Sequence, residues 1–202
     1  MASRYDAHTA LVVVDVQNDF ADPAGSLYVT GARDVVKMVN GETRQASEAG
    51  ALVVYTQDWH PASTPHFAKD GGIWPVHCVA DTWGAAFHPD LNVAGPAVKK
   101  GTNGEDGYSG FTVKDTATGA ATPTQLEGLL RSQGITRVVV VGLATDYCVS
   151  ATALDATRLG FATEVLQDAI AAVDLADGDG ARAVAAMAAA GCVLGFCFGT
   201  MP

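Results

Sequence analysis

Four side chains that could take part in catalysis each stand at or near the end of a short apolar segment. They are Asp15, Asp58, Lys100 and Cys148. If these segments are parallel strands, their carboxyl ends meet at one edge of a sheet, where ligands bind in open α/β folds. A thiol, an ammonium group and two carboxylates at one edge are the main indication of a reactive site.

Cys148 is the candidate nucleophile, because it follows the turn Gly-Leu-Ala-Thr-Asp and opens a predicted helix. The helix dipole and nearby N–H groups are expected to lower the thiol pKa. The N–H groups of Ala144 and Cys148 could together stabilise an oxyanion. The alternative is an inert cysteine packed between strand and helix, since free cysteines are often buried.

Asp15 and Lys100 each have a structural and a catalytic interpretation. Asp15 is either a general base or an acceptor for loop N–H groups. Lys100 is either directed into the site or solvated. Lys99 beside it points to the opposite side of an extended strand, so only one of the two can face the site.

A second cluster has the composition of a metal site. One carboxylate and three imidazoles suit Zn²⁺, Fe²⁺ or Mn²⁺, and they come from Asp58, His60, His66 and His77. In an extended chain Asp58 and His60 share one face. The alternative is a solvated, histidine-rich loop that binds nothing.

The elements that must position these residues predict a doubly wound, Rossmann-like α/β fold. Short apolar runs rich in valine alternate with helical patterns, which favours a mainly parallel sheet of about six strands with helices on both faces. We expect strands at 10–16, 51–57, 98–100, 138–141, 162–166 and 193–198, and helices at about 35–50, 122–134, 148–159 and 180–190. A long irregular segment spans 58–95. One domain is expected over 1–202.

Composition excludes several classes of protein. Hydrophobic residues make up 49% and charged residues 17%, which is enough for a large core. No apolar run reaches the roughly 20 residues of a membrane span, and the first residues lack the apolar core of a signal peptide. A cytoplasmic protein is therefore expected. The net charge of -10 opposes nucleic-acid binding. None of Cys78, Cys148, Cys192 and Cys197 forms a C-x-x-C pair, and a cytoplasmic chain needs no disulfides.

Six motifs, in this order, resemble the isochorismatase-like cysteine hydrolases, in particular their nicotinamidase/pyrazinamidase branch. They are Asp-Val-Gln-Asn-Asp-Phe from 15, Asp-Trp-His from 58, Trp-Pro-Val-His-Cys-Val from 74, Lys-Gly from 100, Tyr-Ser-Gly-Phe from 108 and Gly-Leu-Ala-Thr-Asp-Tyr-Cys-Val from 142. The resemblance implies a catalytic triad of Asp15, Lys100 and Cys148. It also implies a cis peptide entering Ala144, whose N–H joins that of Cys148 in an oxyanion hole.

The same resemblance implies a substrate and a cofactor. The substrate is a small pyridine carboxamide, cut to the acid and ammonia through a thioester. One divalent metal on Asp58, His60, His66 and His77 would bind the pyridine nitrogen. Here five residues separate His60 from His66, a wider spacing than in the commoner pattern of the branch. The implied pocket walls are Phe20, Trp74, Tyr108 and Tyr147, and the loop 101–107 before Tyr108 departs from that pattern.

Three other hypotheses remain at this point. The chain could be a related cysteine amidase acting on carbamoyl or ureido substrates, although such relatives generally lack the metal ligands. It could be a metallohydrolase that needs no thiol. It could also be a non-catalytic metal-binding or thiol-sensing protein. Asp168 is either an indirect support of the site or a helix cap or loop anchor, and the expected assembly is a monomer or a small homo-oligomer.

Overall fold

A computed structural model describes residues 4–197. Its centre is a six-stranded sheet in the order β3-β2-β1-β6-β7-β8, and every pairing in it is parallel. The strands are β1 (Thr9–Val14), β2 (Leu52–Asp58), β3 (Ala97–Lys100), β6 (Arg137–Leu143), β7 (Ala162–Ala171) and β8 (Val193–Gly195). The predicted fold class is confirmed.

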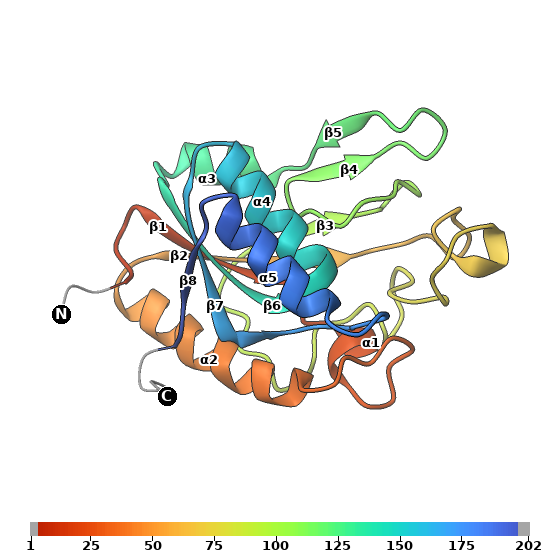
Figure 1. The fold of residues 1–202 in the computed structure, drawn as a ribbon, viewed down its shortest axis with the longest axis horizontal. Helices are drawn as coiled ribbons and strands as arrows, with labels where there is room; N and C mark the ends of the chain where they lie inside the picture. The colour runs from red at the N-terminus through yellow and green to blue at the C-terminus, as the bar shows by residue number, and fades with distance from the viewer. Residues whose placement is uncertain (1–3, 198–202) are drawn as a thin grey trace.

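Helices cover both faces of this sheet (Figure 1). On one face lies α2 (Ala32–Glu48), and on the other lie α3 (Leu126–Ser132), α4 (Ser150–Arg158) and α5 (Asp179–Ala189). Strand β1 shows why valine-rich runs suit this place. Leu11 and Val13 pack toward α2 while Val12 and Val14 pack on the other side, all fully buried. None of the helices in residues 4–197 has the length and apolar character to cross a membrane.

Three short helical turns lie near the carboxyl ends of the strands. They are α1 (Asn18–Ala21), the 3₁₀ turn η1 (Ala68–Asp70) and the π-helical turn η2 (Thr145–Val149). Between β1 and β6 the chain order reverses, because β2 and β3 extend the sheet one way and β7 and β8 the other. A crevice at such a reversal is where doubly wound folds bind ligands.

The segment before α3 differs from the prediction. A hairpin of β4 (Thr112–Lys114) and β5 (Ala121–Pro123) replaces the expected helix start at Thr122-Pro123. The helix begins at Leu126, where the N–H donates to Thr124 Oγ1 at 3.1 Å. The predicted helix start at Thr122 is therefore wrong: Thr122 lies in β5, and Gln125, the residue before the helix, makes no side-chain cap hydrogen bond. At the other end, β8 is shorter than predicted, and the expected Phe198 lies outside the described residues.

Candidate active site

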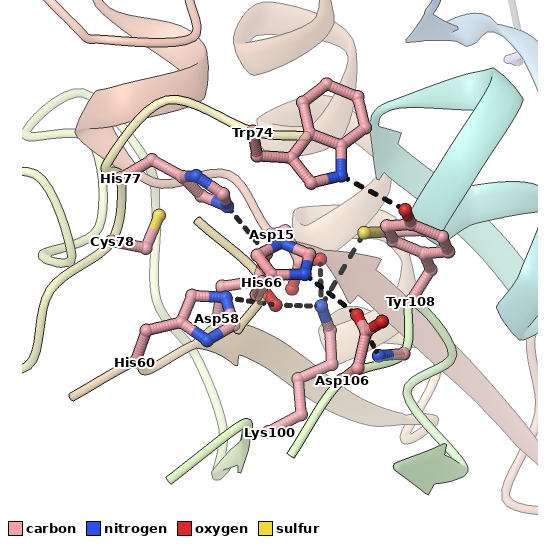
Figure 2. Close-up of polar contacts among 12 residues, drawn as sticks. Asp15, Asp58, His60, His66, Trp74, His77, Cys78, Lys100, Asp106 and Tyr108 are labelled. Carbon is pink, nitrogen blue, oxygen red and sulfur yellow. Dashed lines mark hydrogen bonds and ion pairs between the residues drawn. The ribbon is translucent and has the colours of Figure 1, made fainter. Parts of the chain in front are cut away.

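The register of the sheet brings the predicted reactive residues together. Asp58 and Lys100 are direct partners in the β2–β3 pairing. Val14, just before Asp15, is paired with Gly142, the first residue of the turn that leads to Cys148. The ammonium of Lys100 lies at the centre: Nζ is 2.9 Å from Asp15 Oδ2, 3.5 Å from Cys148 Sγ and in contact with Asp58 Oδ1. Figure 2 shows this ammonium group between the two carboxylates.

Asp15 is held in one orientation by the neighbouring strand. Its backbone turns into the left-handed region at φ 47°, which an aspartate tolerates better than most residues. Thr56 Oγ1 donates to Asp15 Oδ1 at 2.6 Å and accepts the Asp15 N–H at 3.3 Å. With Oδ1 engaged by the hydroxyl, Oδ2 is the oxygen directed at Lys100.

Burial and charge act in opposite directions on the two acidic groups of the site. Burial raises the pKa of Asp15, and the ammonium of Lys100 only partly offsets this. For Asp58, burial also raises the pKa, but Lys100 and the neighbouring histidines outweigh it and bring it down to about 2. Asp15 is therefore the carboxylate better suited to accept and return a proton.

The Cys148 thiol lies in η2, directly after a cis peptide between Leu143 and Ala144, as the resemblance implied. The expectation of a lowered thiol pKa is wrong. Burial raises the pKa of Cys148 well above its ordinary value; Lys100 lowers it, and the charges of Asp15 and Asp58 raise it. The thiol is thus protonated at rest, with a carboxylate beside it that can take the proton.

Three histidines form a compact cluster next to Asp58. One ring nitrogen from each of His60, His66 and His77 lies within 4.8 Å of the others. His60 Nε2 and His77 Nε2 are each 4.0 Å from an oxygen of Asp58. The wider spacing before His66 therefore does not remove it from the cluster. Burial lowers the pKa of His60 to about 4 and also lowers that of His77, so both are neutral, the form that binds metals.

The hydrogen bonds of these rings fit a metal site. His77 Nδ1 is 2.8 Å from the Pro75 carbonyl oxygen, which can only accept, so Nε2 keeps its lone pair. Within residues 4–197 neither ring nitrogen of His60 has a hydrogen-bond partner, although only 2% of the residue is exposed. Buried polar atoms normally have partners. A divalent metal would supply a partner for one of the two His60 ring nitrogens, and the donors present are those such ions prefer.

A pocket with largely aromatic walls opens above the thiol. All four predicted wall residues line it, namely Phe20, Trp74, Tyr108 and Tyr147. Ala144 and Cys148 line it too, so the predicted oxyanion donors belong to residues at its surface. Trp74 Nε1 donates to Tyr108 Oη at 3.0 Å, which fixes two of the rings relative to each other. A slot of this composition suits a flat, uncharged ring.

Sequence reasoning missed several residues around the site. Leu27 and Val173 also line the pocket, but both lie in loops without a local pattern. The sequence could have indicated Thr56 as a site residue, because it lies two positions before Asp58 and so shares its face of the strand. Asp168 lies within β7, and its Oδ1 accepts the Cys197 N–H at 2.9 Å, so it is a loop anchor outside the pocket lining.

The chain is similar in sequence and fold to known proteins. The family model of the isochorismatase domain matches residues 9–194. A nicotinamidase of Acinetobacter baylyi is 38% identical over 185 residues, covering 82% of each chain. A nicotinamidase/pyrazinamidase of Mycobacterium tuberculosis is 41% identical over 169 residues, covering 81% of this chain and 87% of that one.

Two solved structures agree in fold. The pyrazinamidase of Pyrococcus horikoshii in complex with zinc has a TM-score of 0.83 and 39% identity, covering 94% of this chain and 99% of that one. PnC1 from L. infantum in complex with nicotinate has a TM-score of 0.87 and 35% identity, with 97% and 96% covered.

Proposed function

This chain belongs to the isochorismatase family of hydrolases, and from that membership and the geometry of its site we propose that it is a nicotinamidase. It hydrolyses nicotinamide, and pyrazinamide as a close analogue, to the carboxylic acid and ammonia, and the nicotinate formed enters NAD salvage. The observation that carries the proposal is the position of Lys100 Nζ, 2.9 Å from Asp15 Oδ2 and 3.5 Å from Cys148 Sγ, beneath an aromatic pocket.

We assign the first half of the reaction to Asp15 and Cys148. Asp15 Oδ2 takes the thiol proton as the sulfur bonds to the carboxamide carbon. The negative charge moves to the carbonyl oxygen, where the N–H groups of Ala144 and Cys148 can stabilise it. When the C–N bond breaks, the proton on Asp15 goes to the leaving nitrogen. Ammonia departs, and a thioester remains on the sulfur.

The second half uses the same carboxylate. Asp15 takes a proton from a water molecule whose oxygen attacks the thioester carbon. The C–S bond then breaks, the sulfur recovers the proton and the acid is released. Lys100 keeps its charge throughout. Burial lowers the pKa of Lys100, but the carboxylates of Asp15 and Asp58 outweigh it and raise the pKa well above its ordinary value. Its fixed positive charge stabilises the transient thiolate.

One divalent metal fits the cluster and would be held by Asp58, His60, His66 and His77. When bound, it would act as a Lewis acid for the ring nitrogen of the substrate. Zn²⁺, Fe²⁺ and Mn²⁺ all suit this donor set. His66 and His77 also line the pocket, next to Trp74. The ring of Trp74 and two of the metal ligands therefore form one wall of the pocket.

The wider setting agrees with this activity. Cys78, Cys148, Cys192 and Cys197 are all free thiols, as expected for a cytoplasmic enzyme. We propose the cytoplasm as its location, residues 1–202 as one domain, and a monomer or small homo-oligomer as its form. No nucleic-acid partner is expected, since the net charge is -10, and no membrane partner is expected, since no apolar run is long enough to span one.

The test is ammonia release by the purified enzyme with one divalent metal supplied. We expect turnover of nicotinamide and a much lower rate with benzamide, which has the same shape but no ring nitrogen. Cys148→Ala should lower kcat about 10⁴-fold or more. Cys192→Ala, which removes another buried thiol, should leave kcat unchanged. Equal rates on the two amides would contradict the ring-nitrogen contact, and an active Cys148→Ala enzyme would contradict the thioester route.

A further inference from the structure

The carboxylate of Asp106 contacts one of the proposed metal ligands from outside the cluster. Asp106 Oδ1 lies 2.8 Å from His66 Nδ1, across 40 positions of sequence (Figure 2). Asp106 belongs to the loop that follows Lys100, whereas His66 belongs to the long segment after β2. We propose that Asp106 is a positioning residue for the metal site, which it serves by fixing the tautomer and the orientation of the His66 ring.

The tautomer follows from the chemistry of the pair. An ionised carboxylate can only accept a hydrogen bond, so His66 Nδ1 must carry a proton, and in the neutral ring Nε2 then keeps its lone pair. In Figure 2 the second nitrogen of the His66 ring lies on the side that faces His77. Metal-binding histidines commonly use their other nitrogen in this way.

The backbone of Asp106 is itself fixed. Its N–H donates to the Lys114 carbonyl at 2.8 Å, and its carbonyl accepts the Lys114 N–H at 2.6 Å, which ties the loop to the β4–β5 hairpin. Asp106 Oδ1 also accepts the Gly107 N–H at 2.7 Å. These hydrogen bonds hold the Asp106 carboxylate in place independently of its contact with His66.

The same loop also accommodates a second histidine. Gly101 has φ 77°, and a Cβ built on it would lie 2.7 Å from His60 Nδ1, so any side chain there would collide with the ring. Further along, the Gly104 carbonyl accepts from Thr64 Oγ1 at 3.2 Å. One end of the loop thus leaves space for His60, and the other end holds His66. The hairpin that was not predicted from sequence supports this arrangement.

This inference rests on the proposed function, because it assumes that His66 binds the metal. The matched variants are Asp106→Ala, Asp106→Asn and Glu105→Gln. Glu105 carries the neighbouring negative charge, but its carboxylate binds Asn103 and no site residue. The Glu105→Gln variant therefore separates the effect of the negative charge from the effect of the hydrogen bond to His66. Asp106 has a side chain that is 46% exposed, so its removal should not unfold the protein.

The measurement is the Zn²⁺ dissociation constant of the metal-free full-length chain, by competition with a chromophoric chelator. We expect Asp106→Ala to weaken binding by about 10- to 100-fold. Asp106→Asn, which keeps a weaker acceptor, should lose less, and Glu105→Gln should stay within about twofold. If Asp106→Ala binds Zn²⁺ as tightly as the wild type, the inference is overturned while the nicotinamidase proposal stands. A wild-type chain that binds no Zn²⁺ overturns both.

A second measurement does not depend on the metal. Imidazole ¹⁵N shifts of the metal-free protein, at a pH where His66 is neutral, report which nitrogen carries the proton. We expect the Nδ1–H form in the wild type and in Glu105→Gln, and a shift toward the Nε2–H form in Asp106→Ala. An unchanged tautomer in Asp106→Ala would overturn the positioning role.

Discussion

The side-chain amide of Gln17 makes hydrogen bonds to both backbone groups of Asp58. The Asp58 N–H donates to Gln17 Oε1 at 2.8 Å, and the Asp58 carbonyl accepts Gln17 Nε2 at 2.7 Å. The amide also donates to the Ala85 carbonyl at 2.9 Å. Gln17 is fully buried two residues after Asp15, so one side chain joins the end of β1 to the end of β2. Asp58, the partner of both Lys100 and the histidines, is held in place by this contact.

Gln17→Ala should therefore destabilise the protein. The substitution leaves a buried N–H and a buried carbonyl of Asp58 without a partner and opens a cavity. We expect the free energy of unfolding to fall by about 2–5 kcal/mol, measured by urea denaturation. Gln133→Ala, at an exposed glutamine after α3, is the control and should change it by less than about 0.5 kcal/mol. Similar losses in both variants would show that the contact with Asp58 adds little.

Thr56→Val should lower kcat with little change in KM. Valine has nearly the same shape but cannot donate the 2.6 Å hydrogen bond to Asp15 Oδ1. A hydrogen bond to a charged group contributes about 1.5–3 kcal/mol, so kcat should fall roughly 10- to 100-fold if all of it is lost in the transition state. Thr56→Ser keeps the hydroxyl and should recover most of the rate. A Thr56→Val enzyme with the kcat of the wild type would show that the hydroxyl contributes little to the reaction.

The sequence was sufficient to predict the sheet and the edge where the site lies. Every residue of β1 is buried, which is what a run such as Ala-Leu-Val-Val-Val requires, and parallel pairing then places Asp15, Lys100 and Cys148 at one edge. The motifs around these residues were specific enough to indicate the family. Short strands rich in β-branched residues are the part of an α/β fold that a sequence encodes most directly.

Other features depend on contacts between distant segments and could not be predicted. The β4–β5 hairpin is short, all of β5 is exposed, and Thr122-Pro123 within it resembles a helix start. The pairing of Asp106 with His66 spans 40 residues and follows no periodicity. The thiol pKa was predicted in the wrong direction, because position after a strand indicates the helix dipole but not the burial of Cys148 beside two carboxylates.

Removal of the metal should abolish turnover of nicotinamide and lower thermal stability. A ligand that binds only the folded state at 100 times its dissociation constant adds about 2.7 kcal/mol to the free energy of unfolding. We expect chelator treatment to lower the midpoint of thermal unfolding and Zn²⁺ to restore it. His60→Ala should lose this response, whereas His8→Ala, at an exposed histidine far from the cluster in sequence, should keep it. A midpoint that chelation does not move would contradict a metal at these residues.

The stability of the protein at alkaline pH should depend on Tyr5, a buried tyrosine near the start of the chain. Tyr5 Oη donates to Glu42 Oε2 at 2.6 Å, and both residues are buried. Burial, followed by the charge of Glu42, raises the pKa of Tyr5 far above its ordinary value of 10.0. The folded protein therefore keeps this proton when the unfolded chain has lost it. The resulting stabilisation is complete below about pH 10, the pKa of tyrosine in the unfolded chain, and declines as the pH rises above it.

Tyr5→Phe removes this contribution and tests its sign. Urea unfolding at pH 9, 10 and 11 should show a wild-type free energy that falls more steeply with pH than that of Tyr5→Phe, with a difference in slope of up to about 1.4 kcal/mol per pH unit. Tyr28→Phe, at a side chain that is 38% exposed, is the control and should follow the wild type. Parallel curves for the wild type and Tyr5→Phe would mean that Tyr5 loses its proton at the same pH in both states, because only a difference in proton binding between folded and unfolded chains can produce the slope.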